Sequence, residues 1–267
     1  MLELARIPQK ADTGAAWSAP GPGGLAMGLA RTARELEAIQ RLRYNIFTEE
    51  MAAVFPDSVD GLDCDRYDAW CEHLMVKELS TGRVVGTYRM LTPANARKAG
   101  GYYSESEFDI GGLARMRGTL AEVGRSCIHA DYRNGAVIML LWSGITRLMR
   151  DVGARYVLGC ASVSLRDDGV TAAEVWRAAN KILQDDPALR LVAPHCRYPV
   201  ERLDSVLPAR IPPLIKGYLK LGASICGEPA WDPDFNTADF PVLLDMGRMD
   251  ARYRRHFGLD VRQAVAA

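Results

Sequence analysis

The sequence is short of several features on which common protein functions depend. Its 33 Lys and Arg residues are matched by 33 Asp and Glu residues, so the chain has no formal net charge. Without a basic excess it is poorly suited to polyanions, which argues against a general nucleic-acid-binding protein. No stretch approaches the ~20 consecutive apolar residues that a membrane-spanning helix needs. We therefore expect a cytoplasmic protein that binds no nucleic acid, with a peripheral contact to the inner membrane face left open.

Cysteine usage gives no sign of a metal site or a disulfide framework. The six cysteines contain no Cys-x-x-Cys pair, and no histidine stands at the spacing typical of a zinc site. Several cysteines lie in apolar runs, where reduced and buried thiols are expected. The chain also contains no Walker loop, dinucleotide-binding glycine motif or serine nucleophile elbow. We expect neither a bound metal nor a bound cofactor.

The composition is that of a globular protein with a substantial core. Of the 267 residues, 48% are hydrophobic and 25% are charged, and this length suffices for one large domain. Residues 1–30 are rich in Ala, Gly and Pro and lack the continuous apolar segment of a signal peptide. They predict a flexible N-terminal extension. We expect a single domain over residues 31–250 and a C-terminal tail over residues 251–267.

Hydrophobic periodicity and turn residues predict alternating helices and strands. Thr32 and Glu35 form the pattern of a capping box at the start of the first predicted helix. Residues 80–82 separate two strand-like runs, as in a hairpin. The predicted helices cover residues 32–51, 134–153, 172–183 and 214–221. The predicted strands cover residues 73–79, 83–91, 120–128, 156–163, 223–227 and 240–245. This order indicates an α/β protein with a mixed central sheet flanked by helices.

Two predicted strands contain charged residues, which are costly inside a protein unless they are paired or used. Arg89 lies in the strand over residues 83–91, whereas Glu122 and Arg125 lie in the strand over residues 120–128. Residues three apart in a regular strand point to opposite faces. Gly124 favours a bulge, which would redirect one of the two side chains. The pair could serve a reactive site, and the alternative is an internal Glu122–Arg125 ion pair that only holds strands together.

Charged residues outside these strands form a second group of candidates. Arg43 and Phe47 lie four residues apart on one helix face, where a guanidinium can bind a carboxylate and the ring can wall a pocket. The alternative is a surface arginine beside a core phenylalanine. Asp65 and Asp68 occupy an acidic turn, either as capping residues or as partners of the strand arginine. His73 opens a strand and is either structural or a general base.

The helix predicted from residue 134 carries basic residues at both ends. Backbone N–H groups at its start, beside Arg133, Asn134 and Gly135, make an anion site suited to a phosphate, unless this is an ordinary turn. Near its far end stand Arg147, Arg150 and Arg155. These three arginines either complement the helix dipole or form a patch for an acidic partner, to which Arg115 and Arg117 could contribute.

The order of these charged residues resembles that of the acyl-homoserine-lactone synthases. The shared order is Arg43 and Phe47, Asp65 and Asp68, Arg89, and Glu122 and Arg125. The surrounding sequence is more similar to relatives of those enzymes, the N-acyltransferases that form ornithine lipids from acyl carrier protein thioesters. This second resemblance rests on residues 71–76, 101–109, 141–145, 214–223 and 227–232. It implies the GNAT fold, that of the N-acetyltransferase superfamily, over residues 36–248.

The resemblance also implies a reaction. A 3-hydroxyacyl group would pass from acyl carrier protein to the α-amine of L-ornithine, giving lyso-ornithine lipid in the first step of ornithine lipid biosynthesis. Glu122 is then the first candidate for the base and His73 the second, with Asp65 and Asp68 at the mouth of the acceptor site. Two alternatives stay open. One changes the acceptor to another amino acid such as glutamine, or makes the chain an acyl-homoserine-lactone-type synthase, and the other is a non-catalytic module that binds acyl carrier protein.

The phosphate-binding loop departs from the superfamily pattern, which is Arg or Gln followed by x-x-Gly-x-Gly or Ala. Gly135 stands only two residues after Arg133, and no second glycine follows. This departure suits the single phosphate of a phosphopantetheine arm better than coenzyme A. The donor substrate is therefore expected to be the acyl-phosphopantetheine of acyl carrier protein, with residues 214–223 as part of the wall of an acyl tunnel.

Overall fold

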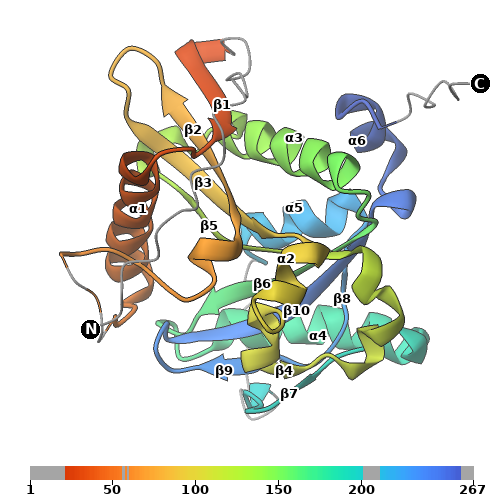
Figure 1. The fold of residues 1–267 in the computed structure, drawn as a ribbon. Helices are drawn as coiled ribbons and strands as arrows, with labels where there is room; N and C mark the ends of the chain where they lie inside the picture. The colour runs from red at the N-terminus through yellow and green to blue at the C-terminus, as the bar shows by residue number, and fades with distance from the viewer. Residues whose placement is uncertain (1–21, 56–57, 59, 201–210, 260–267) are drawn as a thin grey trace, which may run out of the picture.

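The computed structural model describes residues 22–55, 58, 60–200 and 211–259 (Figure 1). Within these residues, eight strands form one mixed sheet in the order β1-β2-β3-β5-β6-β10-β8, with β9 paired to β10. The strands are β1 Leu25–Leu29, β2 Glu72–Glu78, β3 Val84–Leu91, β5 Leu120–Ile128, β6 Tyr156–Ser164, β8 Ser224–Ile225, β9 Ala230–Asp232 and β10 Thr237–Asp245. All neighbours are antiparallel except β5 and β6. The predicted mixed sheet is confirmed.

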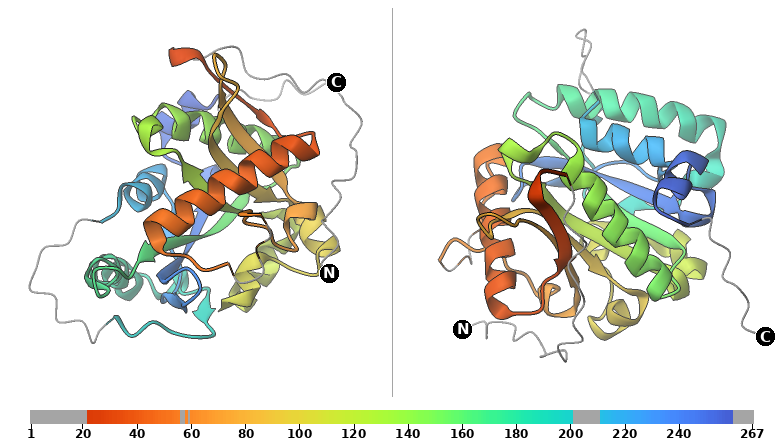
Figure 2. Two further views of the ribbon diagram at one scale, coloured as in Figure 1. Left: turned by 90° about the vertical axis from the view of Figure 1, so that its left-hand side faces the viewer. Right: turned by 90° about the horizontal axis from the view of Figure 1, so that it is seen from above.

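Helices cover both faces of this sheet (Figure 2). They are α1 Ala33–Met51, α2 Pro93–Lys98, α3 Ala136–Asp151, α4 Val170–Asp185, α5 Pro213–Leu221 and α6 Ala251–His256. Successive strand residues point to opposite faces, so Met75 packs with α1 whereas Leu74 and Val76 pack with α3. Trp176 of α4 and Tyr218 of α5 join the α3 side. The core is therefore divided into a layer on each side of the sheet.

Local sequence signals fix the start of α1 and the first hairpin. The Thr32 hydroxyl accepts the N–H of Glu35 at 3.2 Å, and the Glu35 carboxylate accepts the N–H of Thr32 at 3.3 Å. The predicted capping box is thus present. β2 and β3 pair antiparallel across the turn at residues 79–83, with Met75 opposite Thr87, which confirms the predicted hairpin.

The bulge predicted near Gly124 is present in β5. Thr87 pairs with Cys127 and Arg89 pairs with Gly124, so β5 advances three residues where β3 advances two. Arg125 is in the left-handed region, with a φ of 50°, a strained conformation for a residue with a side chain. Because of this extra residue, Glu122 and Arg125 line the same cavity although they stand three residues apart.

The sheet opens between β5 and β6. These strands pair only over residues 120–122 and 156–158. Beyond that point β6 follows β10, with which it pairs along its whole length, whereas β5 follows β3. Residues 123–126 are therefore not paired with β6, and they line a cavity.

Both ends of the domain differ from the predicted boundaries. Residues 25–29 fall in the predicted flexible extension, but they form β1 because Leu25 is buried in the core and the strand pairs with β2. The predicted tail begins with α6, whose Tyr253 packs against the main core. Residues 1–21 and 260–267 lie outside the described residues. Among the described helices, none combines the length and the apolar character needed to cross a membrane.

Candidate active site

A cavity of about 100 Å³ lies where β5 and β6 diverge. Four of the predicted site residues line it: Phe47, Arg89, Glu122 and Arg125. Leu214 and Tyr218 of α5, from the predicted acyl-binding segment 214–223, line it as well. Lining residues that the sequence did not single out come from the 3₁₀ turn η3 (Tyr103–Ser106), β6 and the β9–β10 hairpin. They include Tyr103, Ser104, Cys160, Ser162, Asp232, Phe235 and Asp239.

Glu122 is buried in this cavity wall and held by η3. The backbone N–H of Ser104 donates to Oε1 and the backbone N–H of Tyr103 donates to Oε2, each at 2.7 Å. The Ser104 hydroxyl also donates to Oε1. Burial raises the pKa of Glu122, and these hydrogen bonds oppose the rise. The result is an oriented carboxylate with a pKa above that of an ordinary glutamate, as suits a general base.

Three aspartates in the loop before β2 bind two buried arginines. Arg43 of α1 contacts Asp63 Oδ2 through Nε and Asp68 Oδ2 through Nη2, both at 2.8 Å. Arg89 Nη1 lies 2.7 Å from both Asp65 Oδ1 and Asp68 Oδ1. Burial alone would raise the pKa of Asp68, but Arg43 and then Arg89 hold it well below its usual range. The predicted pairing of Arg89 with these acids is confirmed.

Three residues that were predicted to bind the acceptor belong to this network and do not line the cavity. The sequence predicts such a role for Arg43, Asp65 and Asp68, but none of them lines the cavity. Arg43 is completely buried, and its charge is already neutralised inside the protein. A buried arginine released from its partners would be very costly, so these residues form the support behind Phe47 and Arg89. Asp63 belongs to the same support, and no pattern in the sequence marked it.

Arg125 is held more loosely than the other two arginines and faces the cavity. Its Nε lies 3.3 Å from Asp63 Oδ2 and its Nη2 lies 3.4 Å from Asp65 Oδ2. The guanidinium lies 5.0 Å from the ring centroid of Tyr103 and 4.7 Å from that of Phe235, and aromatic faces attract cations. The alternative of a Glu–Arg ion pair within β5 is therefore wrong. A substrate carboxylate can compete for this guanidinium.

His73 lies outside the cavity lining. It is buried in β2, and its Nε2 donates to the backbone carbonyl of Asp68 at 2.9 Å, so the ring proton is on Nε2. Burial lowers the pKa of His73 to about 4. The imidazole is neutral and supports the aspartate loop, and its predicted role as second candidate base is not supported by this position.

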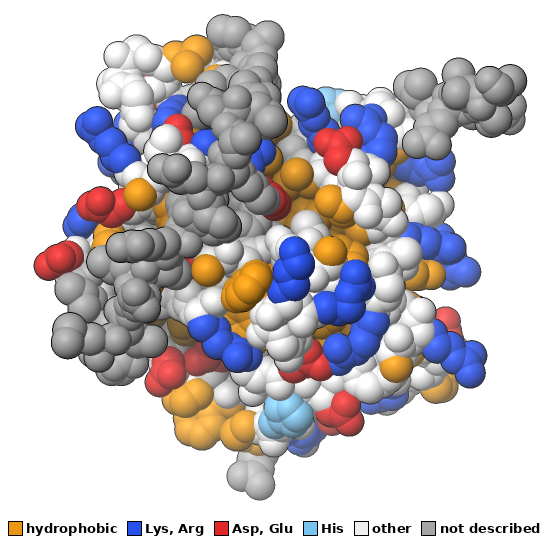
Figure 3. Space-filling model, in the orientation of Figure 1, with side chains coloured by type: hydrophobic (Ala, Val, Ile, Leu, Met, Phe, Trp, Pro, Cys, Tyr) orange, Lys and Arg blue, Asp and Glu red, His pale blue; other side chains and the backbone are white. Residues whose placement is uncertain are grey.

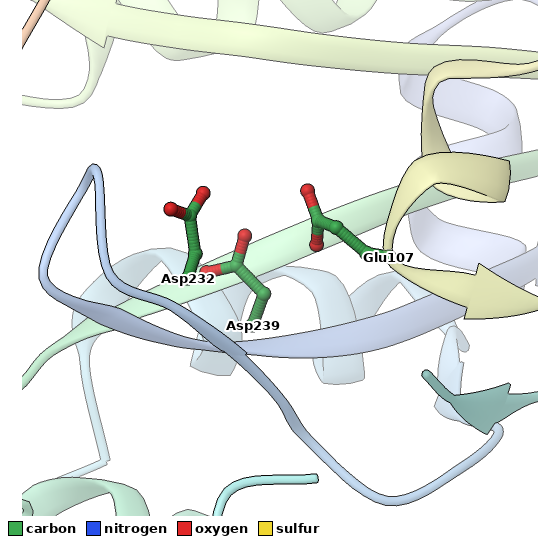
Figure 4. Close-up of side chains that lie close together, drawn as sticks. All are labelled: Glu107, Asp232 and Asp239. Atoms are coloured by element: carbon green, nitrogen blue, oxygen red, sulfur yellow. The ribbon is translucent and has the colours of Figure 1, made fainter. Parts of the chain in front are cut away.

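A second acidic group, which the sequence did not reveal, lies beside the cavity (Figure 4). Glu107 follows η3, Asp232 ends β9 and Asp239 lies in β10, and one carboxylate oxygen from each lies within 4.8 Å of the others. Asp232 and Asp239 line the cavity. Burial, followed by repulsion from Asp239 and Asp232, raises the pKa of Glu107 to about 9. Burial also raises the pKa of Asp239 to about 6. We call these three residues the acidic cluster.

Two thiols line the cavity, and neither is activated. Burial raises the pKa of Cys71 to about 12 and that of Cys160 well above its usual range. A protonated thiol is a poor nucleophile. All six cysteines are free, as predicted, although Cys64 and Cys196 are exposed and not buried. Neither thiol lining the cavity is therefore a candidate nucleophile.

The loop predicted to bind a phosphate leads from β5 into α3. Gly135 has a φ of 96°, which a side chain would disfavour, and α3 begins at Ala136. The Asn134 side chain accepts the N–H of Ala136 at 3.1 Å. Arg133 pairs with Glu50 at the surface. Exposed pairs of this kind are weak, so an incoming phosphate could replace Glu50.

Two basic surfaces lie outside the cavity. Arg147 and Arg150 are 70% and 52% exposed, each 3.9 Å from Asp151. Arg155 is bound more firmly, through contacts of 3.0 and 2.7 Å to Asp245. The second surface lies over α2 and the 3₁₀ segment η4 (Gly111–Thr119), where Figure 3 shows Lys and Arg side chains gathered on one face. Its exposed basic residues are Arg97, Lys98, Arg115 and Arg117.

Comparison with known proteins gives consistent results. A family model described as an acetyltransferase (GNAT) domain matches residues 42–143. The L-ornithine N(alpha)-acyltransferase of Rhizobium meliloti (strain 1021) is 35% identical over 253 residues, which cover 87% of this chain and 83% of that protein. The L-ornithine N(alpha)-acyltransferase of Brucella abortus (strain 2308) is 34% identical over 263 residues, covering 91% and 92%.

The fold is also that of a solved structure. FeeM, an N-acyl amino acid synthase from uncultured soil microbes, superposes with a TM-score of 0.52 at 12% identity. The match covers 84% of this chain and 92% of FeeM. Together with the matching family model, this likeness confirms the predicted GNAT-like fold.

Proposed function

Since this chain belongs to the family of the L-ornithine N(alpha)-acyltransferases, we propose that it acylates the α-amine of L-ornithine with a 3-hydroxyacyl group from acyl carrier protein, giving lyso-ornithine lipid. The chain is an acyltransferase of this kind. The observation that carries the proposal is the position of Glu122. An oriented, buried carboxylate lies in the cavity where the diverging strands expose backbone.

The proposed chemistry needs one proton acceptor. The α-ammonium group of the acceptor loses a proton to Glu122, and the free amine attacks the thioester carbon. Glu122 passes this first proton to solvent. A C–N bond then forms, the attacking nitrogen loses its second proton to Glu122, and the C–S bond breaks as the departing thiolate takes that proton. Residues 123–126 line the cavity and are not paired with β6, so a backbone N–H group of this segment would stabilise the oxyanion that develops on the carbonyl oxygen. Arg125 binds the α-carboxylate of the acceptor.

The acyl chain requires an apolar channel next to this site. The cavity wall contains Tyr88, Val123 and Tyr218, and the same three residues line a smaller adjoining cavity of about 20 Å³. That second cavity is otherwise apolar, with Trp142 and Leu244 among its walls. Members of the predicted acyl-binding segment 214–223 contribute to both cavities. An acyl chain entering between β5 and β6 would extend from the main cavity into the adjoining cavity and would widen both.

The donor phosphate and the carrier would bind on the surface near α3. The phosphopantetheine phosphate would lie at Arg133, Asn134 and Gly135, against the start of the helix. Acyl carrier proteins are acidic, so the exposed Arg147 and Arg150, with Arg155 four residues beyond the end of α3, are proposed to steer the carrier. An amphiphilic product would be released at the membrane face.

Charge reversal at Arg147 and Arg150 is expected to weaken carrier binding without changing the chemical step. The double variant Arg147→Glu/Arg150→Glu should raise KM for the acyl carrier thioester about tenfold at low salt and leave kcat unchanged. The difference should shrink as salt screens the charges. The control is Lys98→Glu/Arg115→Glu, on the basic surface over α2 and η4. A rise in KM for the control variant alone would show that the carrier docks on the basic surface over α2 and η4.

The function is tested by incubating the purified protein with 3-hydroxyacyl carrier protein and a panel of amino acids, followed by mass spectrometry. We expect acylated ornithine as the main product. Acylated glutamine in its place would support the acyl-transfer reaction but contradict ornithine as the acceptor. No acylated product with any amino acid, together with tight carrier binding, would contradict the enzyme and favour a carrier-binding module.

A further inference from the structure

The acidic cluster of Glu107, Asp232 and Asp239 has no role in the steps described above. Adjacent carboxylates repel one another, and burial adds to the cost of their charge. Both carboxylate oxygens of Glu107 are buried, and the groups beside them are the Tyr103 hydroxyl and the Asp239 carboxyl. Figure 4 shows the three carboxylates directed toward a common space. Three ionised carboxylates this close would repel one another, and a cation among them would offset that repulsion.

The geometry of the acidic cluster fits an ammonium group. A primary ammonium has three N–H donors and no acceptor, and the acidic cluster offers three carboxylates within 4.8 Å of one another. Hydrogen bonds from neighbouring groups orient two of these carboxylates, those of Asp239 and Asp232. The Thr237 hydroxyl donates to Asp239 Oδ1 at 2.7 Å, and the backbone N–H groups of Asp234 and Phe235 donate to Asp232 Oδ1 at 3.0 and 3.1 Å.

We infer that the acidic cluster binds the side-chain ammonium of a diamino-acid acceptor, and that Glu107, Asp232 and Asp239 thereby set the acceptor specificity of the enzyme. The inference rests on the proposed function, because the acceptor must reach the cavity that Asp232 and Asp239 share with Glu122. With a cation bound, all three acids can ionise. Without one, the raised pKa of Glu107, about 9, keeps a proton on the acidic cluster.

Charges of opposite sign then orient the acceptor within one cavity. Arg125 attracts the α-carboxylate, and the acidic cluster attracts the side-chain ammonium. Tyr103 contacts both groups, with its ring 5.0 Å from the Arg125 guanidinium and its hydroxyl beside Glu107. Its backbone N–H is bonded to Glu122. An acceptor held at both ends would present its α-amine to Glu122. An amino acid with an uncharged side chain would leave buried carboxylates without a partner, which is a strong basis for rejection.

The test compares ornithine with 2-aminopentanoate, which has the same carbon chain but no side-chain ammonium. For the wild-type enzyme, kcat/KM should favour ornithine. Asp239→Asn and Glu107→Gln should each reduce that preference at least tenfold, by lowering kcat/KM for ornithine and not for 2-aminopentanoate. Asp109→Asn removes an exposed acid two residues from Glu107 and should leave the preference unchanged.

Each contrary outcome has a distinct meaning. An equal loss for both amino acids, or no loss for either, in the two acidic-cluster variants would overturn the inference and leave the proposed function intact. A wild-type enzyme that acylates neither amino acid would overturn the proposed function itself. A divalent cation that binds at the acidic cluster and is needed for turnover would also overturn the inference.

Thermal unfolding shows whether these variants retain the fold. A carboxyl whose pKa is raised in the folded state destabilises the protein as pH rises from its ordinary pKa toward the folded one, because the unfolded chain releases the proton first. Glu107 should therefore lower stability progressively between its ordinary range and pH about 9. Glu107→Gln removes this effect, so its melting temperature should exceed that of the wild type, and the excess should grow up to pH about 9.

Discussion

Replacement of Glu122 by glutamine is expected to lower kcat by about 10²–10⁴-fold, the range typical of a lost general base. Glutamine matches the shape of glutamate but cannot take a proton from the acceptor amine. In the wild type, the fall of kcat toward acid pH should report a group with a pKa above that of an ordinary glutamate, because burial raises the pKa of Glu122. This limb of the pH profile should be absent in the variant.

The measurement needs two controls, since Glu122 also anchors η3. Circular dichroism and thermal unfolding should confirm that the variant is folded. Binding of the acyl carrier thioester should remain within about twofold of the wild type, because the predicted docking residues lie outside the cavity. A folded variant with wild-type kcat would show that another group takes the proton.

Replacement of Arg43 by methionine is expected to have the largest effect on stability. The substitution removes a guanidinium that is completely buried and takes one of their ion-pair partners from Asp63 and Asp68. Breaking a buried pair in this way costs about 3–5 kcal/mol, because the remaining charges stay inside the protein. Chemical denaturation monitored by tryptophan fluorescence would measure the loss.

Arg41→Met provides a matched control on the same helix. Arg41 pairs with Glu37 at the surface, with 47% of its side chain exposed, and exposed pairs contribute less than about 1 kcal/mol. Arg43→Lys should fall between the two, since lysine keeps the charge but cannot form the fork. A loss for Arg43→Met as small as that for Arg41→Met would contradict the structural role assigned to this network.

The sequence predicted a structural feature correctly where one strand contained the charged residue that made the feature necessary. Charges within the apolar run of β5, with Gly124 between them, predicted the bulge that the register confirms. Arg89 in β3 predicted a charged partner, and Asp65 and Asp68 are its partners. In each case the cost of an unpaired charge in a buried strand limited the possible arrangements.

The sequence was insufficient where burial depends on a distant segment. Arg43 had the pattern of a substrate-binding residue, but the loop carrying Asp63 and Asp68 folds over α1 and buries it. No local pattern on a helix distinguishes a guanidinium that meets substrate from one that meets such a loop.

The acidic cluster was missed for a similar reason. Glu107, Asp232 and Asp239 belong to three elements that only the tertiary fold brings together. The length of one strand was a sequence signal that could have revealed Asp239. β10 spans Thr237–Asp245, whereas the predicted strand began at residue 240, and the longer strand would have placed Asp239 inside a buried run.

The position of the acyl group on ornithine tests the account most directly. Glu122, Arg125 and the acidic cluster together predict that the α-amine reacts while the side-chain ammonium is held away from the thioester. Tandem mass spectrometry of the product made from ornithine and a 3-hydroxyacyl carrier thioester distinguishes the two nitrogens. We expect acylation at the α-nitrogen alone. Acylation at the side-chain nitrogen would contradict the assigned orientation and, with it, the roles of both charged ends of the cavity.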